Sequence, residues 1–308
     1  MNKKDFIKRS LDTTNAFGTF QDEATAVNPN IWDFRLREYQ EKLLVLTPQA
    51  EQFDFRGAGT DYKVTIDEAP SAAAALTETV DVPISAFSTR NVTFDPSEYG
   101  AGYQLTRNEA VRAFFNVADR MTKKLGYAMA QKKDSLAYTA VQSGAGNSVI
   151  VGTSTHASTL GASDTLSYAA ITEAIKLIEE DLYMPMDMFI SYQQKQDLLN
   201  LQTVNEADKF GTRDAVAKGL VGELFGLKIW VSHSVTKQTT AGSDFEDAIV
   251  LGVTGSGERA FGYAIKRDPM IEREYHARGR YWDIVAHEEY DFKVLHPDAI
   301  CKISTYRA

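Results

Sequence analysis

Helical periodicity is the clearest pattern along the chain. Apolar residues spaced three and four apart predict an amphipathic helix over residues 31–46, which Pro48 would end. The same spacing runs without proline through residues 106–143, where Thr106 and Glu109 have the spacing of a capping box. If this second helix is continuous, it is about 54 Å long at about 1.5 Å per residue. A helix of that length needs a sheet or a neighbouring subunit to lie along.

Two further helices are predicted over residues 167–182 and 192–202. In the long helix, the apolar positions expected to face inward are Val111, Phe114, Ala118, Met121, Leu125 and Ala128, with Leu136 and Val141 extending them. In the helix over residues 167–182, the positions expected to face inward are Ile171, Ala174, Ile175, Ile178 and Leu182.

Alternating polar and apolar residues predict strands between the first two helices. Residues 61–67 and 88–95 alternate in this way and predict two strands. Their connector is rich in alanine, contains Pro70 and Pro83, and is long for a compact domain. It is either a short helical turn or mobile loop, or a projecting hairpin whose tip meets another molecule.

The second half of the chain mixes helices with short apolar strands. Strands are predicted at residues 188–190, 228–232, 248–253 and 260–267, which together with the helices favours an α/β lobe around a small sheet. A Gly/Ser/Thr-rich passage before this lobe marks its boundary. The last forty residues predict a long hairpin that turns at Gly279, followed by a terminal strand after Pro297. No internal repeat of fixed period is present.

Composition narrows the class of protein. The 308 residues suit one elaborated unit or two lobes, and 44% hydrophobic with 24% charged residues is typical of a folded soluble protein. The net charge of −9 disfavours binding to nucleic acid or to anionic membranes. Cys301 is the single cysteine, which excludes an intrachain disulfide. There is no secretory signal and no apolar stretch of about 20 residues, so we expect a soluble protein made in a reducing compartment.

A glycine cluster is the first candidate for chemistry. Gly219, Gly222 and Gly226 precede an apolar run, and Lys218 precedes them. A phosphate-binding loop follows a strand, opens a helix and carries its lysine after the last glycine. Here the strand follows the glycines, so turns that lead into a strand are the favoured interpretation.

Serine motifs are the second candidate. Residues 152–156 (GTSTH) lack the closing glycine of a nucleophile elbow. Ser234 and Lys237 match S-x-x-K, but the companion motifs of that class are missing.

Histidines and carboxylates give no better site. His156, His233, His276, His287 and His296 include no pair at the i,i+4 spacing of a helical metal site. The carboxylate runs Glu179-Glu180-Asp181 and Glu288-Glu289 are typical of solvated faces. We therefore predict no catalytic, cofactor-binding or metal-binding residues and no enzymatic activity.

A basic cluster lies near the predicted hairpin turn. Arg273, Arg278 and Arg280 are interleaved with Glu272 and Glu274. This pattern favours cross-strand or intersubunit ion pairs over a nucleic-acid patch. The first 30 residues are polar and mixed, which predicts an extended or mobile arm. Such an arm, a projecting hairpin and a long helix are typical of a subunit that exchanges segments with its neighbours.

The order of these parts resembles the major capsid protein of tailed bacteriophages, with its Hong Kong 97-like fold. The most specific local pieces are GLVGELFGLKIWVS, residues 219–232, and ARGRYWDIV, residues 277–285. The resemblance implies an α+β fold with an N-terminal arm, an extended β-hairpin loop, a long spine helix, a peripheral lobe and an α/β axial lobe. The implied segments are 1–52 for the arm, 53–97 for the extended loop, 98–150 for the spine helix and the first part of the peripheral lobe, 151–267 for the axial lobe, and 268–308 for the return strands of the peripheral lobe.

The resemblance also implies a function. The chain would form pentamers and hexamers of an icosahedral head around double-stranded DNA, without sequence-specific DNA contacts. It would be made in the host bacterial cytoplasm and would work with a separate scaffolding protein, a portal and decoration proteins. The first alternative is an encapsulin-like nanocompartment shell that houses an enzyme. The remote alternative is an α/β hydrolase-type enzyme.

Overall fold

The computed structural model describes most of the chain from residue 45 onward. The described residues are 45–57, 59–67, 88–113, 117–152, 156–200, 220–235, 237–240 and 243–307. The predicted helix over residues 31–46 lies almost entirely outside them, and so does the connector between the first two strands. The chain divides into two compact units. The described part of the first unit is residues 102–113, 117–126 and 271–285, and the second unit holds the other described residues.

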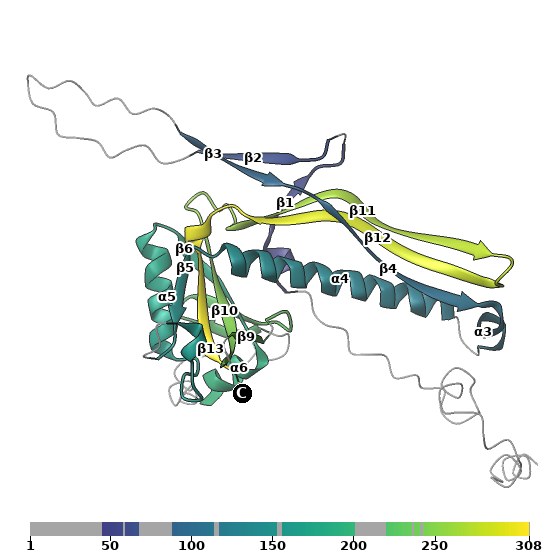
Figure 1. Ribbon diagram of the computed structural model, residues 1–308. Helices are drawn as coiled ribbons and strands as arrows, with labels where there is room; N and C mark the ends of the chain where they lie inside the picture. The colour runs from purple at the N-terminus through teal and green to yellow at the C-terminus, as the bar shows by residue number, and fades with distance from the viewer. Residues whose placement is uncertain are drawn as a thin grey trace, which may run out of the picture. The chain divides into compact units, whose positions relative to one another are not determined.

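A four-stranded sheet has the order β1-β11-β12-β4 (Figure 1). Its strands are β1 (Glu51–Asp54), β4 (Ser97–Thr106), β11 (Phe261–His276) and β12 (Tyr281–Val294). β1 runs parallel to β11, with Glu51 opposite Gly262. β11 and β12 are joined by residues 277–280, so the hairpin turn predicted at Gly279 is confirmed.

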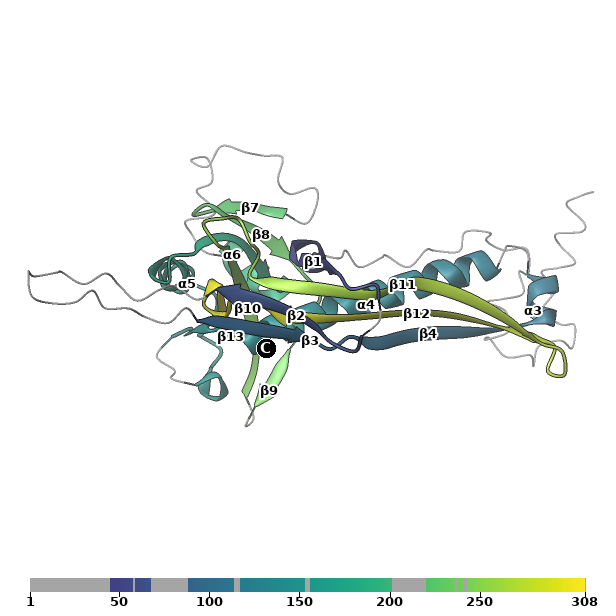
Figure 2. The same cartoon turned by 90° about the horizontal axis from the view of Figure 1, so that it is seen from above.

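A second, seven-stranded sheet has the order β5-β13-β10-β6-β8-β7, and β9 also pairs with β10. Figure 2 shows β7 and β8 at one edge of this sheet. The strands are β5 (Asn147–Ile150), β6 (Met184–Ile190), β7 (Leu220–Leu224), β8 (Leu227–Val231), β9 (Gln238–Thr240), β10 (Ser243–Val253) and β13 (Ile300–Tyr306). Its helices are α5 (Tyr168–Glu180) and α6 (Tyr192–Asn200).

Two strand placements differ from the sequence prediction. The strand predicted at residues 260–267 does not join the α/β sheet, because it is the first half of β11 in the four-stranded sheet. The terminal strand β13 was expected with the return strands, but it pairs with β5 and β10. Alternation along a sequence reveals a strand but not its partner, and this is the reason for both differences.

The first two predicted strands are confirmed as an antiparallel pair. β2 (Tyr62–Asp67) and β3 (Thr89–Phe94) align with Tyr62 opposite Phe94. Phe53 of β1 packs its ring 5.7 Å from that of Phe94, which joins the pair to the four-stranded sheet. The connector of this hairpin stays a prediction.

The predicted continuous long helix is wrong near its start. α3 (Arg107–Arg112) ends at Ala113, whose backbone is extended, and α4 (Val117–Gly144) follows as a separate helix. The capping box itself is confirmed, since the Glu109 amide donates to the Thr106 hydroxyl and the Thr106 amide donates to the Glu109 carboxylate. α3 buries no residue, and Val111 is 76% exposed, so no packing holds the helical path through Ala113.

The end of α5 also differs from the prediction. Ile171, Ala174 and Ile178 are fully buried as expected, but Leu182 is 88% exposed. The helix ends at Glu180, and Leu182 takes a left-handed backbone conformation with a φ of 66°. Periodicity fails here because the chain leaves the helical path before Leu182.

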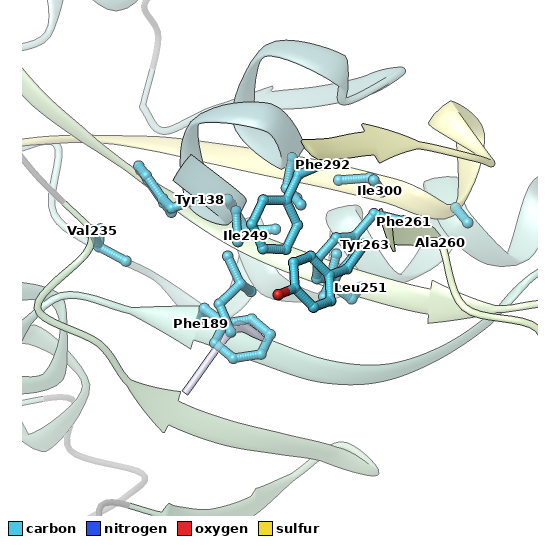
Figure 3. Close-up of a cluster of buried hydrophobic side chains, with 14 of the residues drawn as sticks. Tyr138, Phe189, Val235, Ile249, Leu251, Ala260, Phe261, Tyr263, Phe292 and Ile300 are labelled. Atoms are coloured by element: carbon cyan, nitrogen blue, oxygen red, sulfur yellow. The ribbon is translucent and has the colours of Figure 1, made fainter. Parts of the chain in front are cut away.

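The seven-stranded sheet is buried on both faces. Along β10, Ile249 and Leu251 belong to one apolar cluster, shown in Figure 3, and Ala248 and Val250 belong to another. The alternation follows from the pleat of a strand. On the first face lie Tyr138 and Val141 of α4 with Phe189, Phe261, Tyr263 and Phe292. On the second face lie the buried residues of α5.

A buried carboxylate joins α4 to two other segments. The Oδ1 atom of Asp134 accepts hydrogen bonds from the amides of Leu46 and Thr47, each 2.9 Å long, and from the Thr47 hydroxyl at 3.1 Å. The Oδ2 atom accepts from the hydroxyl of Ser234 at 2.7 Å. Asp134 is almost fully buried, so its removal would leave several polar groups without partners.

Replacing Asp134 tests how much these hydrogen bonds stabilise the fold. We expect Asp134→Ala to lower the free energy of unfolding by about 3 kcal/mol, because buried amides lose their acceptor. Ser234→Ala removes a single hydrogen bond and should cost about 1 kcal/mol. Urea unfolding of the unassembled subunit measures both, and equal midpoints for the two variants would contradict the assigned role of Asp134.

Candidate assembly surfaces

The glycine cluster contains a turn and a strand residue but no anion-binding loop. Gly226 and Phe225 form the two-residue turn between β7 and β8, and both have positive φ. Gly222 lies within β7, next to a register shift, so its expected role as a turn glycine is wrong. Gly219 lies outside the described residues. A strand follows this turn instead of a helix, which agrees with the favoured interpretation.

The S-x-x-K match of Ser234 and Lys237 is not assembled for chemistry. The hydroxyl of Ser234 donates to Asp134, and the ammonium group of Lys237 pairs with Asp244. The two side chains of the S-x-x-K match therefore have separate partners. His156 is exposed at the start of a short 3-10 helix, and the serine and threonines before it lie outside the described residues.

The histidines are dispersed over the fold. His276 lies 2.9 Å from Asp283 across the β11–β12 hairpin, and His296 lies 3.8 Å from Glu258. Burial is the main cause that lowers the pKa of His296, so this imidazole is largely neutral near pH 7. Across the described ranges, no group of three or more His, Cys, Asp or Glu side chains could hold a metal ion. Nor is any helix in that part of the chain long and apolar enough to cross a membrane.

A cavity of about 360 Å³ lies in the second unit. Its lining residues are Ser191, Tyr192, Gln193, His233, Val235, Lys237 and Arg307. Its two cations already have carboxylate partners, because Lys237 pairs with Asp244 and the Arg307 guanidinium lies 3.1 Å from Glu246. The cavity therefore offers little net positive charge to an anion.

The hydroxyl of Ser191 beside this cavity serves to anchor α6. It accepts from the Gln194 amide and donates to the buried carboxylate of Glu246, while Gln194 also donates to the hydroxyl of Thr305. Burial is the main cause that raises the pKa of Glu246. The sequence pattern Ser-x-x-Gln before a helix is a capping signal that could have revealed this network.

The β11–β12 hairpin is an exposed surface of the first unit. The side chains of Ile271, Tyr275 and Val285 are exposed there, and so are Arg278 and Arg280 in the turn. Arg273 donates to the Thr122 hydroxyl at 3.5 Å. No ion pair joins the three arginines to Glu272 or Glu274 in the described part of this unit, so the expected cross-strand pairing involves His276 and Asp283 instead.

A second exposed surface lies at the turn from α5 to β6 in the second unit. Leu182 is 88% exposed and Met184 is 61% exposed, and they directly follow the carboxylates of Glu179, Glu180 and Asp181. Sequence reasoning missed this surface, because it assigned Leu182 to the core and the acidic run to an ordinary solvated face. Exposed apolar side chains next to charges are typical of protein–protein contacts.

Comparison with solved structures identifies the fold. The structure aligns with the capsid of cyanophage P-SCSP1u at a TM-score of 0.69 and 14% identity, covering 92% of this chain and 94% of that one. It aligns with the capsid of Ralstonia phage GP4 at 0.65 and 14% identity, covering 96% and 98%. It aligns with the acid-stable capsid of Helicobacter pylori bacteriophage KHP30 at 0.67 and 11% identity, covering 94% and 100%. These matches confirm the predicted α+β capsid fold of the Hong Kong 97 type.

Comparison of the sequence identifies the family. No curated protein matches the sequence. Residues 90–303 match the phage capsid protein family, which is more than half of the 308-residue chain. The chain therefore belongs to the phage capsid protein family and is a structural subunit of the shell of a virion.

Proposed function

We propose that the chain assembles into pentamers and hexamers of an icosahedral head that encloses a double-stranded DNA genome. In this role it has no enzymatic activity, and binding between copies takes the place of catalysis. Closed shells of this kind need many repeated contacts between identical chains. We further propose that the segments implied by the resemblance, from the arm to the return strands, keep the boundaries given above except at two strands. Residues 260–267 go with the four-stranded sheet, and β13 goes with the seven-stranded sheet.

One observation supports this proposal most directly. Nine consecutive residues of β11, 267–275, are exposed although they lie in a sheet strand, whereas the first five residues of the same strand are buried. Met270, Ile271 and Tyr275 stay 48%, 47% and 44% exposed, so the strand lacks much of the burial that a packed sheet strand has. Contacts with other copies would supply that burial, which is what shell assembly provides.

The partners follow from the same proposal. A separate scaffolding protein would guide assembly, a portal would occupy one vertex, and decoration proteins would bind outside. The net charge of −9 supports loose, non-specific contact with packaged DNA, because the phosphates and the subunit repel each other. The subunit would be made in the cytoplasm of the bacterial host before it joins the virion.

Expression of the full chain alone or with a scaffolding protein tests the function. We expect closed shells or ring-shaped capsomers in negative-stain microscopy and an early peak in size exclusion. Shells that co-purify with one host enzyme would instead indicate a nanocompartment. A stable monomer with a titratable hydrolytic activity that Ser234→Ala abolishes would contradict the structural role.

A deletion tests the hairpin formed by β2 and β3. Removing residues 70–83 should leave a folded subunit, because the paired strands and their contact with β1 remain. If the connector supplies contacts between copies, we expect shell yield to fall at least about tenfold. A loss of about 1.4 kcal/mol per contact already lowers the binding constant tenfold. Circular dichroism checks folding, and a normal shell yield would contradict the projecting-hairpin interpretation.

A further inference from the structure

The tip of the β11–β12 hairpin concentrates positive charge in the first unit. Arg278 and Arg280 lie in the exposed turn, and the Arg107 amide donates to the Arg280 carbonyl at 2.8 Å, which brings the exposed Arg107 to the same place. We call these three residues the arginine tip. The strands that lead to it expose the apolar side chains of Ile271 and Tyr275.

The carboxylates near the arginine tip already have other partners. Glu109 accepts two hydrogen bonds from Thr106 in the capping box. Asp283 and Glu274 lie 2.9 Å and 3.8 Å from the His276 imidazole. The three arginines form no ion pair with any other residue that the structure describes, so their charge is available to a partner.

The opposite charge lies on the α5–β6 turn of the second unit. We call Glu179, Glu180, Asp181, Leu182 and Met184 the acidic corner. The end of a helix carries a partial negative charge, so carboxylates there are repelled unless cations approach. Within the chain, Lys176 lies 3.4 Å from Glu180, but both side chains are more than half exposed and such pairs contribute little.

Leu182 at the centre of the acidic corner has no packing partner to offset its backbone conformation. The Tyr183 amide donates to the Ile178 carbonyl and the Leu182 amide to the Glu179 carbonyl, which is a Schellman motif with Leu182 at the left-handed position. Glycine normally occupies that position, because a side chain there is strained. The side chain of Leu182 is 88% exposed, so its own chain gains almost nothing from the leucine.

We propose that the arginine tip of one copy docks on the acidic corner of a second copy, with Leu182 as the apolar anchor of the contact. The three guanidinium groups would face the carboxylates of Glu179, Glu180 and Asp181, and one oxygen of Asp181 also accepts a hydrogen bond from Asn147 of its own chain. Each surface adds exposed apolar side chains that the contact would bury. The two surfaces are different, so the contact is head-to-tail, the kind that closes rings of identical subunits. This inference rests on the proposed function and specifies one of its contacts.

A second copy suits the arginine tip better than nucleic acid does. Nucleic-acid binding by a chain of net charge −9 would have to overcome repulsion from the rest of the subunit. A second copy, in contrast, carries the matching carboxylates next to an exposed leucine. Apolar contact at the centre of a charged ring is also the usual arrangement of a protein–protein interface.

Charge reversal on each side, alone and together, tests the pairing. We expect Glu179→Lys/Glu180→Lys and Arg278→Glu/Arg280→Glu each to lower shell yield at least about tenfold, and the four changes together to restore at least half of the wild-type yield. The matched control is Glu223→Lys/Glu258→Lys, which reverses two exposed carboxylates elsewhere in the second unit. The control should assemble like the wild type.

The outcomes separate this contact from the proposed function. The contact is wrong if the wild type forms shells and neither double variant loses shell yield. It is also wrong if the combined variant does not recover shell yield. Both results would leave the shell function standing. A wild-type chain that never assembles would overturn both. If Arg278→Glu/Arg280→Glu assembles normally but no longer binds a short DNA duplex, the arginine tip binds nucleic acid and the inference is wrong.

Leu182→Gly provides a second test that does not depend on charge. Glycine relieves the left-handed backbone, so the melting temperature of the unassembled subunit should rise by about 2 °C or more. Shell assembly should nevertheless slow by at least about fivefold, because the anchor is lost. A residue with only a structural role would not raise the melting temperature and slow assembly at the same time when it is replaced. An unchanged assembly rate would contradict the role of Leu182 as an anchor.

Discussion

The attachment of α4 to the rest of the second unit is the constraint on which this structure depends. Two adjacent charged residues of the helix contribute to it. Lys133 lies 2.6 Å from Glu288 of β12, while Asp134 binds the segment before β1 and the loop after β8. Burial lowers the pKa of Lys133, but hydrogen bonds to Glu288 and Tyr263 outweigh it and leave the pKa above its usual value. Buried charges of this kind are tolerated only in one geometry, so they fix which face and which turn of α4 meets the sheets.

With α4 fixed, both faces of the central strand β10 of the seven-stranded sheet are covered by apolar clusters. The pleat of β10 sends Ile249 toward one apolar cluster and Val250 toward the other, and both are fully buried. Polar groups inside this layer, such as Glu246 and Asp247, are used to tie α6, α4 and β13 to the sheet. What remains exposed is the periphery of the fold, namely hairpin tips and helix ends, and the contacts that we propose between copies lie there.

The sequence predicted the elements better than their partners. Alternation and helical spacing located most of the helices and strands, and the capping box placed the start of α3 within a residue. Spacing could not show that β13 pairs with β5 and β10, because the partners are about 150 positions apart in the first pair and about 50 to 60 in the second. For the same reason it could not show that Asp134, an ordinary polar position in the helix pattern, accepts hydrogen bonds from residues 46, 47 and 234. Long-range partners follow from the packed fold and not from a local period.

Two failures of periodicity have a common physical meaning. Val111 and Leu182 both fit the apolar stripe of a predicted helix, and they are 76% and 88% exposed. In each case the helix stops near that residue, at Ala113 and at Glu180, so the apolar side chain has no interior to enter. A lone subunit gains nothing from such a residue, whereas a subunit that buries it against a neighbour gains about 1.5–3 kcal/mol for each large aliphatic side chain. Contacts between copies are therefore best sought at apolar residues of this kind. Helical spacing assigns them to a core, but the fold leaves them exposed.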